Sequence, residues 1–128
     1  MPDSTLKILV VDDMATMRKI IKNILGQLGY WNVEEAGDGR QALDRLRHQS
    51  FDLVISDWGM PKMTGVDLVQ SMRQDPGLRA TPFLMVTPEA EQAKVLEAIK
   101  AGVNGYIVSP VTIETLKEKI NALFESRL

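Results

Sequence analysis

Five short apolar runs alternate along the chain with five segments whose apolar residues recur at helical spacing. The runs cover residues 6–11, 31–36, 51–57, 83–86 and 106–108. They are short and barely alternate with polar residues, which is typical of strands buried on both faces. The periodic segments between and after them cover residues 14–28, 40–47, 66–73, 90–101 and 112–124. This alternation predicts an α/β fold: a doubly wound, five-stranded parallel sheet with right-handed crossovers and helices on both faces.

The composition limits the classes of function. The 128 residues, 45% apolar and 25% charged, suit one globular core, and we expect a single domain spanning 1–128 that is monomeric. The net charge of −2 gives no basis for nucleic-acid binding, and the absence of cysteine excludes disulfides and thiolate metal sites. No apolar run approaches the ~20 residues of a membrane span. Residues 1–5 lack the pattern of a signal peptide, so we expect a cytoplasmic protein without membrane insertion.

Three carboxylates directly follow predicted strands. Asp12 and Asp13 follow the first strand, and Asp57 ends the third, just before a glycine and a proline. In open parallel sheets, ligands bind at the edge where the carboxyl ends of the strands meet. Carboxylates gathered there repel one another unless a cation joins them, and oxygen ligands in a partly open site suit Mg²⁺. Beside the metal, Asp57 can act as a nucleophile toward phosphorus. Taken singly, Asp12 or Asp13 is equally well explained as a cap of the first helix.

The remaining polar residues carry weaker signals. Thr87, at the end of the fourth strand, can either bind a ligand oxygen or close a local turn, whereas Ser109 is interpreted as a loop serine. His48 is expected at the surface. Methionines are expected to fill the core rather than to bind a ligand, at positions 14, 17, 60, 63, 72 and 85. The chain has neither G-x-G-x-x-G after its first strand nor a P-loop, and its single histidine forms no plausible catalytic triad.

Together these residues resemble the receiver domain of two-component response regulators, and among them the single-domain regulators of chemotaxis. The resemblance runs from about residue 7 to residue 124. It rests on four short motifs in a fixed order: 10–13 (VVDD), 55–61 (ISDWGMP), 86–87 (VT), and 105–106 (GY) followed by Pro110. It implies a flavodoxin-like sheet with strand order 2-1-3-4-5 and a cis peptide bond before Pro110.

The resemblance also implies roles for individual residues. Asp57 would accept a phosphoryl group from a sensor histidine kinase, and Asp12, Asp13 and Asp57 would hold Mg²⁺ with the backbone carbonyl of Gly59. Thr87 would bond the phosphoryl group, and Tyr106 would turn inward as Thr87 moves. The face formed by the fourth helix, fifth strand and fifth helix would then bind a partner such as a flagellar motor switch protein. Its contact residues would be Ala90, Val95, Ile99, Tyr106, Val108 and Lys119. Val95 and Ile99, spaced i, i+4, are equally compatible with core packing.

The sequence departs from the family pattern at three positions of the site. Ser109 stands where the family has a lysine, and loss of a charge-assisted hydrogen bond of about 1.5–3 kcal/mol predicts roughly tenfold or greater weakening. Pro88 removes a backbone N–H that helps bind the phosphoryl group in the family, and it biases Thr87 toward extended geometry. Gly59 replaces a polar side chain that influences hydrolysis of the acyl phosphate.

Three functions are therefore open. The favoured one is a phosphorylatable receiver that assists its own phosphorylation and dephosphorylation without being an enzyme, weakened by Ser109 and Pro88. The second is a receiver-like adaptor that binds partners without phosphorylation. The third is a Mg²⁺-dependent aspartate-nucleophile phosphatase, a class that carries D-x-D after its first strand. This chain instead has Asp12-Asp13-Met14 there.

Overall fold

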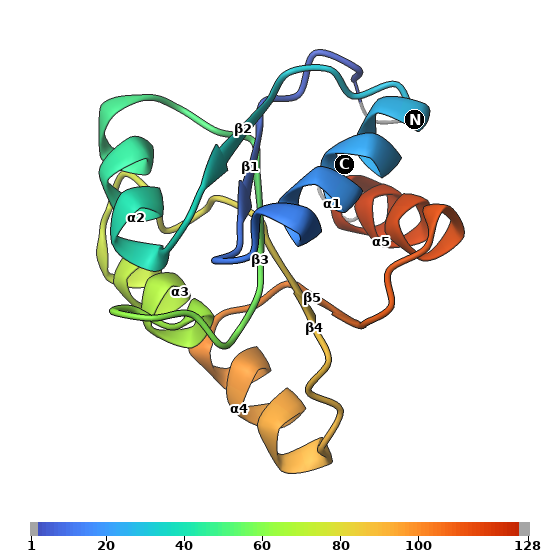
Figure 1. Cartoon of the computed structure of the whole chain (residues 1–128). Helices are drawn as coiled ribbons and strands as arrows, with labels where there is room; N and C mark the ends of the chain where they lie inside the picture. The colour runs from blue at the N-terminus through green and yellow to red at the C-terminus, as the bar shows by residue number, and fades with distance from the viewer. Residues whose placement is uncertain (1–2, 126–128) are drawn as a thin grey trace.

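Strands and helices alternate five times along the chain in a computed structural model, which describes residues 3–125. The strands are β1 (Ile8–Val11), β2 (Val33–Ala36), β3 (Leu53–Ser56), β4 (Phe83–Thr87) and β5 (Gly105–Val108). The helices are α1 (Ala15–Gln27), α2 (Gly39–His48), α3 (Gly65–Gln74), α4 (Gln92–Ala101) and α5 (Ile113–Glu125). Figure 1 shows these elements wound around a central sheet. The predicted α/β architecture is confirmed.

The sheet is parallel throughout and has the implied strand order, β2-β1-β3-β4-β5. β1 pairs with β2 on one side and β3 on the other, so that Val11 lies opposite both Ala36 and Ser56. Every residue of β1, β3 and β4 is buried, which explains why these strands show no alternation of apolar and polar residues. The aligned register brings the carboxyl ends of β1 and β3 to the same edge of the sheet.

Helices cover both faces of the sheet, with α1 and α5 on one face and α2, α3 and α4 on the other (Figure 1). Alternate residues of each strand belong to two separate apolar clusters. Ile8, Val10 and Ile55 pack with residues of α1 and α5, whereas Leu9 and Val54 pack with residues of α2, α3 and α4. Each fully buried aliphatic side chain contributes about 1.5–3 kcal/mol. Two-sided burial therefore fixes the register of the central strands and the position of the residues that follow them.

Three of the helices begin with a side-chain cap. Asp38 accepts a hydrogen bond from the Gln41 N–H at the start of α2, and Thr64 and Asp67 form a capping box on α3. Thr112 accepts from the Thr115 N–H at the start of α5, as predicted. At the first residues of α1 and α4 no side chain makes such a bond. Both of these uncapped starts lie at the edge of the sheet that carries the three carboxylates.

Arg73 joins the end of α3 to the turns that precede β4 and β5. Its Nε and Nη2 donate to the Gly102 carbonyl at 3.1 and 2.9 Å, and its Nη1 donates to the carbonyls of Thr81 and Arg79 at 2.8 and 3.0 Å. Burial lowers the pKa of the Arg73 guanidinium. Gly102 has a φ of +117° and leaves no room for a Cβ, which would lie 2.7 Å from Arg73 Cγ. This clamp ties the segments that lead into β4 and β5 to the end of α3.

The structure differs from the sequence-based expectations at several surface positions. The second strand begins at Val33 rather than at residue 31, and Trp31 lies in the preceding loop with 70% of its surface exposed. Met14 and Ile20 are also exposed, at 59% and 43%, so Met14 does not fill the core as predicted. Met60, Met72 and Met85 are buried as expected. The fourth helix begins at Gln92, two residues later than predicted. Within residues 3–125, no helix is long and apolar enough to cross a membrane.

Candidate metal and phosphoryl site

Hydrogen bonds continue the sheet for one residue beyond the strand ends and so align the predicted site residues. The Asp12 N–H donates to the Ala36 carbonyl at 3.2 Å, and the Asp57 N–H donates to the Val11 carbonyl at 3.0 Å. Between β4 and β5, the Ser109 N–H donates to the Thr87 carbonyl at 2.8 Å. The backbones of Asp12 and Asp57 are therefore fixed side by side by the same pairing that forms the sheet.

The three predicted carboxylates converge. Asp12, Asp13 and Asp57 each offer one carboxylate oxygen, and these oxygens all lie within 4.8 Å of one another. Asp12 is buried with 3% of its surface exposed, Asp57 is half-buried and Asp13 is exposed, so the cluster opens to solvent on one side. The N-cap residue of α1 is Met14, and no side chain makes a cap bond to the helix; Asp12 Oδ1 accepts from the Met14 N–H at 2.9 Å, just before the first helical residue. Neither Asp12 nor Asp13 is therefore the N-cap residue of α1.

The convergence has an electrostatic cost. Burial, together with the neighbouring charges of Asp57 and Asp13, raises the pKa of Asp12 to about 6 against the opposing hydrogen bond from the Met14 N–H. A carboxylate buried among like charges is stabilised by a cation placed between them. An all-oxygen set that is open on one side suits Mg²⁺, which keeps several of its waters. The donor set therefore fits the expected metal.

The loop between β3 and α3 is folded tightly against Asp57. The Trp58 N–H donates to Asp57 Oδ1 at 2.7 Å. The Trp58 carbonyl accepts from the N–H groups of Met60 at 3.1 Å and Gly65 at 2.8 Å. A Cβ at Gly65 would lie 2.2 Å from the Asp57 carbonyl oxygen, so only glycine allows α3 to begin this close. Sequence reasoning missed Gly65, although its position directly after the helix cap Thr64 was a signal.

Gly59 lies in the same loop, and its backbone suits the role that the family resemblance implies. The residue is exposed, and a Cβ there would meet no atom within 4 Å, so the sequence does not need glycine for space. Within the described part of the chain, no hydrogen bond to the Gly59 carbonyl is found. The carbonyl therefore remains available as a fourth oxygen ligand, and it needs no particular side chain at this position.

The end of β4 presents a buried hydroxyl. Thr87 is 3% exposed, and its Oγ1 accepts a long hydrogen bond of 3.4 Å from the Glu89 N–H. This is the ordinary turn bond of a threonine to the N–H two residues on, and Pro88 between them has no N–H of its own. The Tyr106 hydroxyl donates to the Glu89 carbonyl at 2.7 Å, so Thr87 and Tyr106 both contact the β4–α4 loop. Burial raises the pKa of Tyr106, and the charges of Glu89 and Asp57 add to this rise.

Ser109 directly follows β5 as a half-buried residue whose N–H continues the pairing with β4. The peptide bond between Ser109 and Pro110 is cis, as the family resemblance implies. The serine side chain is short and neutral, so this position brings no positive charge to the carboxylates. The backbone at this position thus follows the family pattern, whereas the side chain does not.

Comparisons with known proteins agree with this geometry. Residues 8–121 match the family described as the response regulator receiver domain. The chemotaxis protein CheY of Pseudomonas aeruginosa is 52% identical over 120 residues, which cover 94% of this chain and 97% of that protein. The chain belongs to the response regulator receiver domain family. It is a CheY-like signalling module of the two-component type.

Solved receiver structures have the same fold. The chemotaxis response regulator CheY4 of Vibrio cholerae superposes with a TM-score of 0.85 at 37% identity, covering 92% of this chain and 98% of that one. The receiver domain of a sensor histidine kinase from Pseudomonas aeruginosa superposes with a TM-score of 0.81 at 27% identity, covering 89% and 93%. That structure is described with a magnesium ion coordinated in the active-site cleft.

The expected partner face of this receiver is only partly apolar at its surface. Ile99 and Val108 are 53% and 45% exposed, and Val95 is half-buried. Ala90 is exposed and Lys119 is half-buried. Core packing therefore does not account for Ile99, and the α4 residue buried in the core is Ala98. Leu96, also on α4, is 48% exposed as well.

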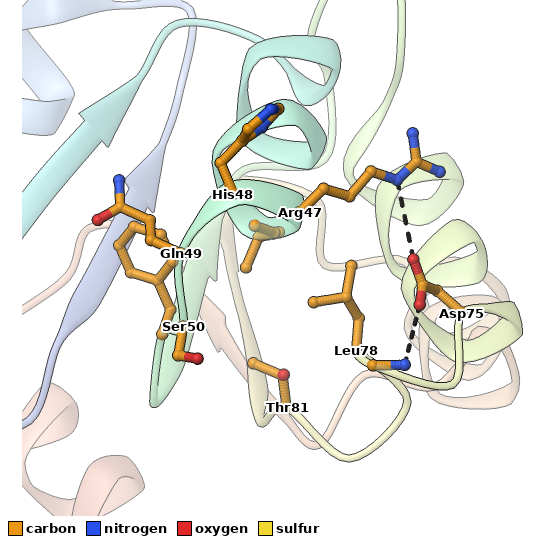
Figure 2. Close-up of a pocket in the computed structure, with 10 residues that line it drawn as sticks. Arg47, His48, Gln49, Ser50, Asp75, Leu78 and Thr81 are labelled. Carbon is orange, nitrogen blue, oxygen red and sulfur yellow. Dashed lines mark hydrogen bonds and ion pairs between the residues drawn. The ribbon is translucent and has the colours of Figure 1, made fainter.

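A cavity of about 360 Å³ lies away from the carboxylates, between the end of α2, the start of β3 and the loop that precedes β4 (Figure 2). Figure 2 shows Arg47 reaching toward Asp75 across it, and these groups form an ion pair of 3.8 Å. His48 is exposed there, as predicted, with its Nδ1 2.7 Å from the Asp44 carbonyl oxygen. Because these residues precede β3 and β4, the cavity belongs to the opposite edge of the sheet and does not contribute to the candidate site.

Proposed function

We propose that this receiver accepts a phosphoryl group on Asp57 from a sensor histidine kinase, with Mg²⁺ bound by Asp12, Asp13, Asp57 and the Gly59 carbonyl. The observation that carries the proposal is the approach of three carboxylate oxygens to within 4.8 Å at the carboxyl edge of the sheet. The raised pKa of Asp12, to about 6, is the expected signature of such a cluster before a cation joins it.

The chain's own groups would place Asp57 for in-line attack on phosphorus. The sheet and the Trp58 N–H fix one carboxylate oxygen, which leaves the other to act as the nucleophile. Bound Mg²⁺ would screen the negative charge of the carboxylate and the incoming phosphoryl group. The Thr87 hydroxyl, still able to donate its proton, would then bond a phosphoryl oxygen.

Phosphoryl stabilisation is weaker in this chain than the family pattern provides. Ser109 brings no charge to the site, and the loss of one charge-assisted hydrogen bond corresponds to about 1.5–3 kcal/mol, or roughly tenfold or more in stability of the phosphorylated state. Pro88 removes a further N–H donor beside Thr87. The loop instead uses the Glu89 N–H, which already bonds Thr87 Oγ1 at 3.4 Å.

Phosphorylation would be relayed to a protein partner through the β4–α4 loop. A move of Thr87 toward the phosphoryl group would pull on the loop whose Glu89 carbonyl accepts from Tyr106. The receiving face would comprise Ala90, Val95, Ile99, Val108 and Lys119. The relatives named as chemotaxis proteins support a flagellar motor switch protein as the partner.

Phosphotransfer from a small donor tests the proposal without a kinase. The protein is incubated with acetyl phosphate and Mg²⁺, and the intact mass and the modified peptide are measured. We expect one phosphoryl group on Asp57, none in Asp57→Asn, and none when EDTA replaces Mg²⁺. Labelling that persists in Asp57→Asn, or fails at saturating donor and metal, would refute the assignment.

Ser109 and Pro88 favour a second candidate, a receiver-like adaptor that binds its partner without phosphorylation. The two candidates differ in how partner binding depends on Asp57. Binding that is strengthened by acetyl phosphate and lost in Asp57→Asn supports the phosphorylated receiver. Equal binding by the native protein and Asp57→Asn, with or without donor, supports the adaptor.

A further inference from the structure

Lys94 occupies an electrostatically unfavourable position at the start of α4. It lies in the first turn of the helix, which contains no acidic residue; the N-cap residue before it is Glu91, and no side chain caps the helix. The N-terminal end of a helix carries partial positive charge, which stabilises anions and disfavours a lysine. A lysine side chain held at this position is stabilised when an anion binds nearby.

The Lys94 amine lies over the residue that adjoins the phosphoacceptor. Its Nζ is 5.7 Å from the centroid of the Trp58 ring, and the Trp58 N–H donates to Asp57 Oδ1 at 2.7 Å. The other contact of the amine is an ion pair of 3.8 Å with Glu97. The side chains of Lys94 and Glu97 are 48% and 54% exposed, and ion pairs of this kind are weak. The amine is therefore held loosely over the side chain of Trp58, the residue that directly follows the phosphoacceptor.

Arg18, another cation at this edge of the sheet, is already engaged. Arg18 Nε donates to Glu35 at 2.9 Å, and its Nη1 donates to the Asp12 carbonyl at 2.6 Å. Position 109 contributes a neutral serine. A phosphoryl group on Asp57 would add negative charge beside the carboxylates of Asp12 and Asp13, and the flexible ammonium of Lys94 has three donors with which to meet it.

We propose that Lys94 supplies the positive charge that Ser109 cannot, by moving from the face of Trp58 to the phosphoryl oxygens when Asp57 is phosphorylated. This inference rests on the proposed function. It assigns a binding role to an α4 residue that sequence reasoning did not select. It also explains how a receiver with serine at position 109 holds an acyl phosphate.

Binding of beryllium fluoride, a mimic of the acyl phosphate, measures this role in the presence of Mg²⁺. The chain has two tryptophans, so Trp31→Phe leaves Trp58 as the sole fluorescent reporter. In that background, Lys94→Gln should raise the apparent Kd by about threefold to tenfold and reduce the ligand-induced change in Trp58 emission. Lys94→Arg should retain most of the affinity. The control is Lys100→Gln, at the far end of the same helix, which should bind like the parent.

A double-mutant cycle with position 109 separates this role from a structural one. In a Ser109→Lys background a second cation is present, so Lys94→Gln should raise the Kd by about twofold or less. An equal loss in both backgrounds would overturn the idea that Lys94 replaces the family lysine. If the native protein is labelled on Asp57 and Lys94→Gln binds like Lys100→Gln, the inference fails while the proposed function stands. If Asp57 is never labelled, the proposed function itself fails.

Discussion

The buried carboxylate of Asp12 is predicted to destabilise the metal-free protein. Burial and the neighbouring charges raise its pKa from the ordinary value of 3.8 to about 6. One pKa unit corresponds to 1.36 kcal/mol, so ionised Asp12 lowers the free energy of unfolding by about 3 kcal/mol at pH 7.5. Asp12→Asn removes the charge and keeps an oxygen that can accept from the Met14 N–H, as Asp12 Oδ1 does at 2.9 Å.

The pH dependence follows from the direction of the shift. Because the pKa of Asp12 is higher in the native state than in the unfolded state, the native protein binds the proton more tightly than the unfolded chain does. The destabilisation is fully present above pH 6, falls to about half at pH 5 and disappears below 3.8. The pKa of Glu35 is lowered by its hydrogen bond from Arg18, so that interaction is lost only at lower pH. The range from pH 5 to 7.5 therefore reports mainly on Asp12.

Urea denaturation in EDTA at pH 7.5 and pH 5 tests this prediction. We expect Asp12→Asn to exceed the native protein in unfolding free energy by about 2–3 kcal/mol at pH 7.5 and by about half as much at pH 5. Asp13→Asn, at an exposed member of the same cluster, should gain about 1 kcal/mol or less. A gain for Asp12→Asn that does not change with pH, or no gain at either pH, would refute the electrostatic reasoning.

Further predictions concern the loop, the clamp and the altered position. Gly65→Ala, whose Cβ would meet the Asp57 carbonyl at 2.2 Å, should lower the free energy of unfolding by about 3 kcal/mol; an unchanged urea midpoint contradicts this. Arg73→Leu should cost about 2–4 kcal/mol because it leaves backbone carbonyls unpaired, whereas exposed Arg79→Leu should cost little; equal losses would count against the clamp. Ser109→Lys should stabilise the phosphorylated state about tenfold, measured as the half-life of the label on Asp57; an unaltered half-life would show that position 109 is not limiting.

The fold and the acidic cluster were predictable because they depend on short-range patterns. Buried strands such as 53–56 carry continuous apolar residues, and the glycine and proline after Asp57 fix where the strand ends. Once the sheet is parallel, the carboxyl ends of β1 and β3 must meet at one edge. Asp12 and Asp57 are therefore brought together by topology alone.

The remaining features depend on packing that no local pattern records. Trp31 and Ile20 have the apolar character of core residues, yet both are exposed, at 70% and 43%. In the sequence, Gly65 is an ordinary first residue of a helix, and only the fold shows that the Asp57 carbonyl lies against it. Lys94 belongs to a distant helical segment, and its approach to Trp58 depends on how α4 docks.

A crystal structure of the protein grown with Mg²⁺ tests the central claim most directly. We predict one Mg²⁺ at the carboxylate cluster, about 2.1 Å from oxygens of Asp13 and Asp57 and from the Gly59 carbonyl, with Asp12 bound directly or through a water. A structure at saturating Mg²⁺ that shows no metal between these side chains, or that shows Asp57 turned away from Asp12 and Asp13, would contradict the account.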